Sequence, residues 1–230
     1  MIPSQLIGRE TGHLAPLAQI PSRLLHTKVH RPFLALQSAA QQAGFDLAIA
    51  SSFRDFDRQL MIWNNKFHGL RPILNSQSQP LDPTTLTESE KIHAIMRWSA
   101  LPGASRHHWG TDLDVYAKNC LPNDIQLQLE PWEYETGHQA EFSQWLNEQA
   151  GKFDFFFPYQ NDQGGVAQEP WHISFAPISH TLLPMLTPEL LVDAWHNTEL
   201  AGKTQILSEL DKLYTRYITN IYENCNGISD

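Results

Sequence analysis

The spacing of hydrophobic positions predicts three helices in the first half of the chain. From residue 29 to 43 apolar side chains recur every three or four positions, which is typical of a helix with one buried face, and Gly44 can end it. A second amphipathic helix is expected at about 54–67. The sequence Thr-Glu-Ser-Glu at Thr87 matches a capping box, so a third helix should begin there and end near Trp98.

Strands are predicted where short apolar runs stand between polar turns. Such runs lie at 45–50, 113–116, 153–157 and 171–175. Because helices come first, short strands follow and strand–helix–strand alternations are few, the pattern favours an α+β fold. We expect a small antiparallel sheet with helices packed on one side.

Two longer segments, 68–86 and 117–137, are rich in turn-forming residues and should be irregular. After them, 139–150 has the pattern of a helix, and the chain is helical again from Pro188 onward. One face of this C-terminal part carries Ile206, Leu210, Leu213, Tyr217 and Ile221.

These patterns predict one domain over residues 1–230. Its core should span about 30–178, and 179–230 should form a C-terminal helical extension. The sequence leaves the oligomeric state open.

Composition narrows the classes of partner. The net charge is −9 and no Lys/Arg cluster exceeds two residues, so the chain lacks the basic stripe that nucleic acid or an anionic membrane requires. No apolar run approaches the ~20 residues of a membrane span, and no leader-like segment is visible, which predicts a cytoplasmic protein. Cys120 and Cys225 are too few for a disulfide framework and should be reduced thiols.

The densest chemical signal is the segment 105–116, which holds two histidines, two aspartates and a glycine. His107 and Asp114 supply an imidazole and a carboxylate, both suitable ligands for zinc. Gly110 would let the chain turn between them, so that a strand returns Asp114 beside His107. This pattern predicts two ligands of one metal ion.

A second signal is Glu-Pro-Trp-His at 169–172, which offers His172 as a third ligand. Three protein ligands with the remaining position open are typical of catalytic zinc, and Glu169 would serve as the catalytic base. In a flat strand Glu169 would face away from His172, because the two are three residues apart. A bulge or twist at Pro170 is therefore required.

A third signal lies where the predicted strand 45–50 meets the following helix. A carboxypeptidase must recognise a free terminal carboxylate, and a guanidinium does so with a bidentate fork. Arg54 stands at the start of the helix and Gln59 lies five positions on, so both side chains are candidates for the cleft.

These residues resemble the VanY-type D-alanyl-D-alanine carboxypeptidases and the LdcB-type L,D-carboxypeptidases, zinc peptidases that share a fold with hedgehog domains. The resemblance covers about residues 30–178. The family pattern Ser-x-His-x-x-Gly-x-Ala-x-Asp is matched at Ser105, His107, Gly110 and Asp114. The patterns Glu-x-Trp-His and Arg-x4-Gln are matched at Glu169, Trp171, His172, Arg54 and Gln59.

The resemblance implies one zinc ion per chain, and Arg54, Gln59 and Ser105 holding the terminal D-amino acid. We expect Trp171 to form a wall of the cleft. The chain departs from the family at Asp112, where alanine is usual. We expect Asp112 to orient His107 or to pair with Arg106, and His108 to serve packing rather than ligation.

The leading hypothesis is a cytoplasmic L,D-carboxypeptidase that removes the terminal D-alanine from murein tetrapeptides during recycling. A D,D-carboxypeptidase acting on D-Ala-D-Ala ends is the close alternative. A phage-type peptidoglycan endopeptidase and a non-catalytic, zinc-stabilised binding module remain open, although the acidic tail disfavours the first and Glu169 the second. The spacing from His107 to Asp114 does not fit the His-x-Asp/Glu pair of non-haem iron oxygenases.

Overall fold

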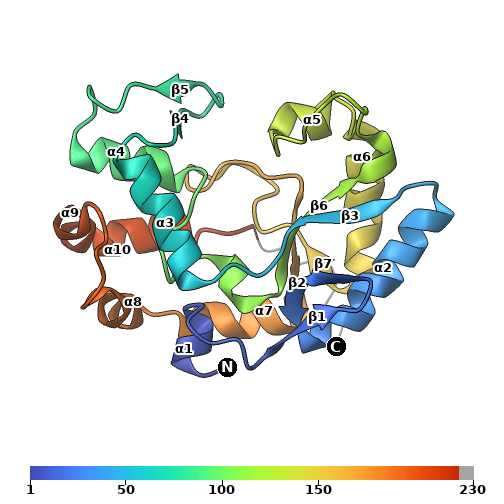
Figure 1. Ribbon diagram of the computed structural model, residues 1–230, viewed down its shortest axis with the longest axis horizontal. Helices are drawn as coiled ribbons and strands as arrows, with labels where there is room; N and C mark the ends of the chain where they lie inside the picture. Colours follow the sequence, from blue (N-terminus) through green and yellow to red (C-terminus); the bar gives the residue numbers. More distant parts are fainter. Residues whose placement is uncertain (223–230) are drawn as a thin grey trace.

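The structure, a computed structural model, describes residues 1–222. Its centre is a four-stranded sheet in the order β3 (Leu47–Ser51), β6 (Asp112–Ala117), β8 (His172–Phe175) and β7 (Phe155–Phe156) (Figure 1). Each neighbouring pair is antiparallel. The expected α+β fold with a small antiparallel sheet is therefore confirmed.

The register of the sheet brings distant segments of the chain together. In the pairing of β6 with β8, Asp114 lies opposite His172 and Asp112 lies opposite Ser174. On the other side of β6, Asp114 faces Ser51 of β3, next to a register shift in that ladder. Asp114 and His172, two of the three predicted ligands, are therefore neighbours in the sheet.

The opposite face of the sheet packs against helices α2 (His30–Gln42) and α6 (Ala140–Gln149) (Figure 1). Leu113 and Val115 of β6 are fully buried in this core, as their alternation with the aspartates predicts. The other members of the core that come from these helices are Phe33, Leu36, Ala40, Phe142 and Leu146.

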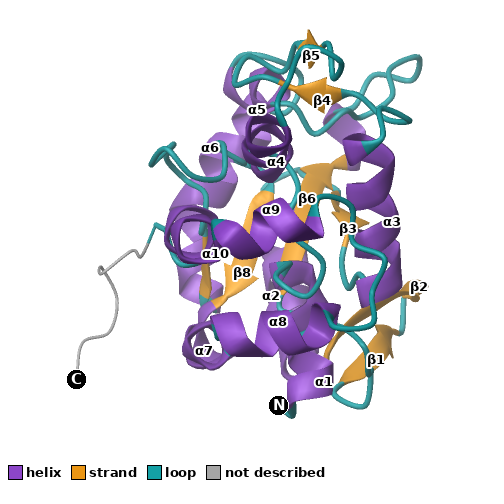
Figure 2. Ribbon diagram, turned by 90° about the vertical axis from the view of Figure 1, so that its left-hand side faces the viewer, coloured by secondary structure: helices purple, strands orange, loops and turns teal. Residues whose placement is uncertain are grey.

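A second hydrophobic core lies beside the sheet, between α3 (Phe56–Phe67), α4 (Glu88–Met96) and the C-terminal helices (Figure 2). These helices are α7 (Ala176–Leu182), α8 (Pro188–Trp195), α9 (Lys203–Ser208) and α10 (Leu210–Leu213), followed by a π-helical turn at Tyr214–Ile218. The predicted apolar face of this part is buried throughout, from Ile206 to Ile221. Cys225 and the end of the predicted extension lie outside the described residues, and Cys120 is a free, half-buried thiol.

Several short elements were not predicted. Helix α1 (Pro3–Leu6) and the hairpin of β1 (Leu14–Leu17) with β2 (Ile20–His26) precede the predicted core. The segments expected to be irregular contain a small hairpin, β4 (Ile73–Leu74) with β5 (Pro80–Leu81), and helix α5 (Pro131–Glu135). No helix among residues 1–222 has the length and apolar character to cross a bilayer.

Candidate metal centre and cavity

A short helical turn presents the first candidate ligand. Residues Arg106–Trp109 form a 3-10 helix that ends at Gly110, whose φ of 67° is in the left-handed region. A Cβ at Gly110 would lie 2.8 Å from the backbone nitrogen of His26, which donates a hydrogen bond to the Gly110 carbonyl. The turn expected at this glycine is therefore present, and β6 leads Asp114 back to His107.

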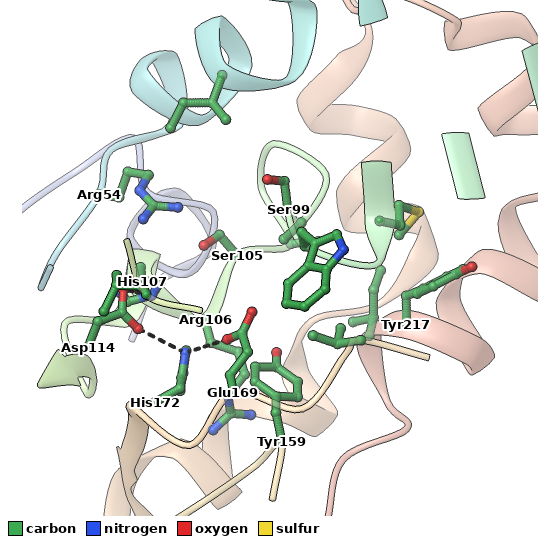
Figure 3. A pocket seen from close by; sticks show the side chains of 18 of the residues that line it. Arg54, Ser99, Ser105, Arg106, His107, Asp114, Tyr159, Glu169, His172 and Tyr217 are labelled. Carbon is green, nitrogen blue, oxygen red and sulfur yellow. Dashed lines mark ion pairs between the residues drawn. The ribbon is translucent and has the colours of Figure 1, made fainter. Parts of the chain in front are cut away.

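Three buried side chains converge at this point. One ligand atom from each of His107, Asp114 and His172 lies within 4.8 Å of the other two (Figure 3). The distance from His107 Nε2 to Asp114 Oδ2 is 3.4 Å, and that from His172 Nδ1 to Asp114 Oδ1 is 3.3 Å. Two imidazoles and a carboxylate at this spacing are a donor set suited to one metal ion.

In both His107 and His172, the ring nitrogen that points away from the candidate metal site makes a hydrogen bond. His107 Nδ1 lies 2.9 Å from the carbonyl oxygen of Ser52, so it must carry the proton, and Nε2 keeps a free lone pair. His172 Nε2 donates to Asp112 Oδ1 at 3.0 Å, so Nδ1 is the nitrogen that faces the site. His107 Nε2 and His172 Nδ1 are therefore the two nitrogens that a metal ion would contact.

Asp112 thus orients His172, and the expectation that it orients His107 is wrong; the Ser52 carbonyl does that. The expected pairing with Arg106 is present, with Nε 2.7 Å from Asp112 Oδ1. Burial would raise the pKa of Asp112, but the Arg106 guanidinium and the hydrogen bond from His172 hold it well below its usual range. Asp112 is therefore an anion under the imidazole of His172.

The charges around His172 attract a cation. Burial lowers the pKa of His172, yet the nearby carboxylates of Asp112, Asp114 and Glu169 outweigh burial and raise it well above its ordinary value. His172 Nδ1 and Asp114 Oδ1 are both buried and make no hydrogen bond of good geometry. Such orphaned atoms facing each other fit a metal ion, which would satisfy both and replace the proton.

A turn before β8, rather than a bulge within it, aims Glu169 at the same place. His172 N donates to the Glu169 carbonyl at 3.0 Å, which closes a tight turn with Pro170 in its second position. The side chain then returns toward the site, and Glu169 Oε2 lies 3.2 Å from His172 Nδ1 (Figure 3). The irregularity that the sequence required at Pro170 is this turn.

Arg54 is tied to the segment that carries His107. Its backbone nitrogen donates to the His107 carbonyl at 3.2 Å, and its carbonyl accepts from His108 Nδ1 at 2.6 Å. Because the other nitrogen of His108 accepts from Gly103 N, His108 is a neutral positioning residue whose pKa burial lowers to about 3.

The guanidinium of Arg54 is held by two neighbours. Nη1 donates to Gln59 Oε1 at 2.9 Å and Nη2 donates to Ser51 Oγ at 3.3 Å. Gln59 is fully buried, and its amide nitrogen donates to the Ala100 carbonyl at 2.6 Å. It does not line the cavity described below, so it acts on Arg54 rather than on a ligand.

A cavity of about 310 Å³ opens onto these residues. Its lining includes the three candidate ligands together with Arg54, Ser105, Glu169 and Trp171. Trp171 is otherwise buried against the ring of Tyr134, with 5.5 Å between the centroids. Apart from Gln59, the residues predicted to bind the metal ion, act as the base or contact the substrate thus face one space.

Comparison with known proteins places the chain in a family of carboxypeptidases. The family model "VanY: D-alanyl-D-alanine carboxypeptidase" matches residues 22–178, which is more than half of the chain. The chain belongs to the VanY family. An "Uncharacterized protein" of Haemophilus influenzae is 40% identical over 121 residues, 51% of this chain and 92% of that protein.

Two solved structures show the same fold. "VanYB in complex with D-Alanine-D-Alanine" has a TM-score of 0.50 at 21% identity and covers 81% of this chain and 88% of that chain. The "LdcB LD-carboxypeptidase" has a TM-score of 0.51 at 20% identity and covers 75% of this chain and 73% of that chain. The VanY-family match and the three-residue metal site confirm the expectation of a metal-dependent carboxypeptidase of peptidoglycan.

Some residues that line the cavity belong to none of the sequence motifs. Tyr159 lines it, with its ring edge-on to His172 at 5.0 Å between centroids, and burial raises the pKa of its phenol to about 12. Lys66 and Ser99 also line it, 33 residues apart in the chain. No spacing rule connects such positions, because only the packing of α3 against the segment after α4 brings them together.

Proposed function

We propose that this protein is a zinc-dependent L,D-carboxypeptidase that removes the terminal D-alanine from peptidoglycan tetrapeptides. One observation carries the proposal. A single cavity combines a three-residue metal site, the carboxylate of Glu169 beside it and a guanidinium at Arg54 that can clamp a terminal carboxylate.

Zinc is the metal that this donor set favours, because imidazole and carboxylate with a position left open are the ligands of catalytic zinc. The two imidazoles come from His107 and His172 and the carboxylate from Asp114. When bound, zinc supplies Lewis acidity toward a carbonyl oxygen and lowers the pKa of water.

The side chains have distinct tasks in this proposal. Arg54 binds the terminal carboxylate through the fork of its guanidinium, which Gln59 holds in place, and the Ser105 hydroxyl adds a further contact. Trp171 forms a wall against the peptide. Glu169 takes the proton of the attacking water at its carboxylate and delivers it to the leaving amine.

Burial strengthens these interactions. Burial lowers the pKa of Arg54, whereas the facing charges of Asp114 and Glu169 raise it, so the guanidinium lies within the field of the site. A substrate carboxylate at Arg54 would therefore be bound by a desolvated cation, where a charge-assisted hydrogen bond is worth more than in water. This contact would fix the scissile bond next to Glu169.

A D,D-carboxypeptidase is the second candidate. The matching family model is described as a D-alanyl-D-alanine carboxypeptidase, and the related VanYB structure holds D-Ala-D-Ala. Both activities use the same clamp and base, and they differ only in the residue before the scissile bond. Action in the cytoplasm on recycled muropeptides stays a prediction.

The test incubates the zinc-loaded protein separately with a tetrapeptide and a pentapeptide of the cell wall and follows D-alanine release by mass spectrometry. Release from the tetrapeptide supports the L,D activity, and release from the pentapeptide alone supports the D,D activity. The Arg54→Ala variant should lose either activity by about 100-fold or more, since it lacks the charge-assisted clamp. An endopeptidase would keep its activity in this variant. A binding module would retain zinc without releasing any product.

A further inference from the structure

A second cation faces the same cavity from the last turn of α3. Lys66 Nζ donates a hydrogen bond to Ser99 Oγ at 2.8 Å. No carboxylate among residues 1–222 lies within ion-pair distance of this ammonium group. Both side chains line the cavity. Lys66 thus has a neutral partner but no counter-ion.

The environment of Lys66 disfavours an unpaired charge. Burial, together with the charges of Arg71 and Arg54, lowers the pKa of Lys66 to about 8, and only Glu169 acts in the other direction. Removing an ammonium group from water without a partner costs free energy, which an anion from a ligand would offset. The position is therefore suited to an anionic group that arrives with the substrate.

Lys66 and Arg54 are held by different neighbours in the cavity lining. Arg54 is held by Gln59 and Ser51, whereas Lys66 is held by Ser99. Ser99 lies on the same side of the cavity as Arg54, across from Glu169 (Figure 3). The two cations therefore offer two separately anchored positions for anionic groups.

The charged side chains of the cavity lining support a second position for an anionic group. The whole chain has a net charge of −9, yet this one cavity is lined by four Lys and Arg side chains against three carboxylates, those of Asp114, Glu130 and Glu169. The four cations are Arg54, Lys66, Arg71 and Arg106. Arg106 is neutralised by Asp112, and Arg54 has the terminal carboxylate as its proposed ligand. Lys66, with Arg71 beside it, remains for a further negative charge.

We propose that Lys66 and Ser99 form a second anion subsite, which binds an additional carboxylate of the peptide substrate beyond the terminal one at Arg54. The inference rests on the proposed carboxypeptidase function and adds a substrate class, peptides with two free carboxylates in reach of the cavity. Two positions next to the scissile bond can supply the second carboxylate. It belongs either to the residue before the scissile bond, as in a diamino dicarboxylic acid, or to the side chain of the leaving residue.

Two matched pairs of peptides distinguish these sources. The first pair is the tetrapeptide L-Ala-D-isoglutaminyl-X-D-Ala with meso-diaminopimelate or L-lysine at X, which differ by one free carboxylate. The α-amide of D-isoglutamine removes the further free carboxylate that γ-linked D-glutamate would bring to both members. The second pair keeps lysine at X and ends in D-glutamate or D-glutamine. The value of kcat/KM is measured for each peptide with zinc-loaded wild type, Lys66→Met, Lys66→Arg and Arg58→Met. Arg58 is the matched control, because it is an exposed cation of the same helix that does not line the cavity.

The wild type should favour the carboxylate-bearing member of one pair by about 10- to 100-fold, as expected for a charge-assisted hydrogen bond. Lys66→Met should abolish this preference. Its kcat/KM on the member of the pair that lacks the second carboxylate should stay within about threefold of the wild-type value. Lys66→Arg and Arg58→Met should keep the preference. The pair that responds identifies the source of the carboxylate.

Equal rates within both pairs for the wild type would overturn the subsite, as would a Lys66→Met variant that is slowed equally on both members of a pair. In either case cleavage itself still occurs, and the proposed function stands. If the wild type cleaves none of the four peptides, nor the pentapeptide, the proposed function is wrong and the subsite falls with it.

Discussion

Replacing Asp112 by alanine tests the metal centre most directly, because this carboxylate contacts one candidate ligand without being one. Asp112 Oδ1 accepts from His172 Nε2 at 3.0 Å and from Arg106 Nε at 2.7 Å, and Oδ2 accepts from Thr111 Oγ1 at 2.7 Å and from Ser174 Oγ at 3.0 Å. The substitution therefore releases the imidazole of His172 and leaves the Arg106 guanidinium without its counter-ion.

Two effects of different size follow. Loss of the partner that orients a ligating imidazole weakens metal binding by about 10- to 100-fold, or roughly 1.4–2.7 kcal/mol. The side chain of Arg106 is only 3% exposed, and breaking a buried pair by removing one partner costs about 3–5 kcal/mol of folding free energy. The second effect approaches the whole stability of a small domain and has to be separated from the first.

The double variant Asp112→Ala/Arg106→Met provides this separation, because it removes both charges of the buried pair. We expect it to recover most of the free energy of unfolding in urea while its zinc affinity stays about 10- to 100-fold below wild type. Asp112→Asn retains an acceptor for His172 Nε2 and should bind zinc more tightly than the alanine variants. Zinc affinity is measured by competition with a chromophoric chelator, which needs no enzymatic activity. A folded double variant with wild-type zinc affinity would refute the role given to Asp112.

Three further outcomes are expected. Glu169→Gln should lower kcat about 10²- to 10⁴-fold with zinc content unchanged, as measured by product release and metal analysis, since an amide cannot accept the proton. Gly110→Ala should lower the free energy of unfolding by at least about 1–2 kcal/mol in a urea titration, because φ is positive and the new Cβ would contact the backbone of His26. Lys66 is charged below its pKa of about 8, so the preference for a doubly acidic peptide should be present at pH 7 and decline above pH 8 in rate measurements; Lys66→Arg should keep it.

The sequence was most informative where chemistry and local conformation coincide. Gly110 predicted a left-handed turn, and the alternation of β6 placed Asp114 on the polar face. The hydrogen bond between Asp112 and His172 could not be predicted in this way, because it depends on the register between β6 and β8. That register sets Asp114 opposite His172 and thereby places Asp112 diagonally beneath the same imidazole, 60 residues away in the chain. A shift of one residue would have turned these side chains to the apolar core.

The hairpin of β1 and β2 escaped prediction for a related reason. Its first strand contains Pro16 and alternates weakly, so local pattern gives little sign of it. The hairpin also contacts residues far away in the sequence, through the hydrogen bond from His26 N to the Gly110 carbonyl and through Leu17 and Leu25, which lie in the buried core. The same bond supports the turn that presents His107, so an element outside the predicted core helps to position the site.

The C-terminal extension has a comparable relation to the cavity. The matched family region ends at residue 178, yet Leu183, Leu186, Tyr217 and Ile218 line the space that faces Glu169. The hydroxyl of Tyr217 lies 2.9 Å from His93 Nδ1 and thereby ties the extension to α4. These side chains add an apolar part to the cavity wall, next to which charge interactions with a ligand are stronger than in water. The matched region thus supplies the candidate ligands, Glu169 and Arg54, whereas the extension supplies part of the wall around them.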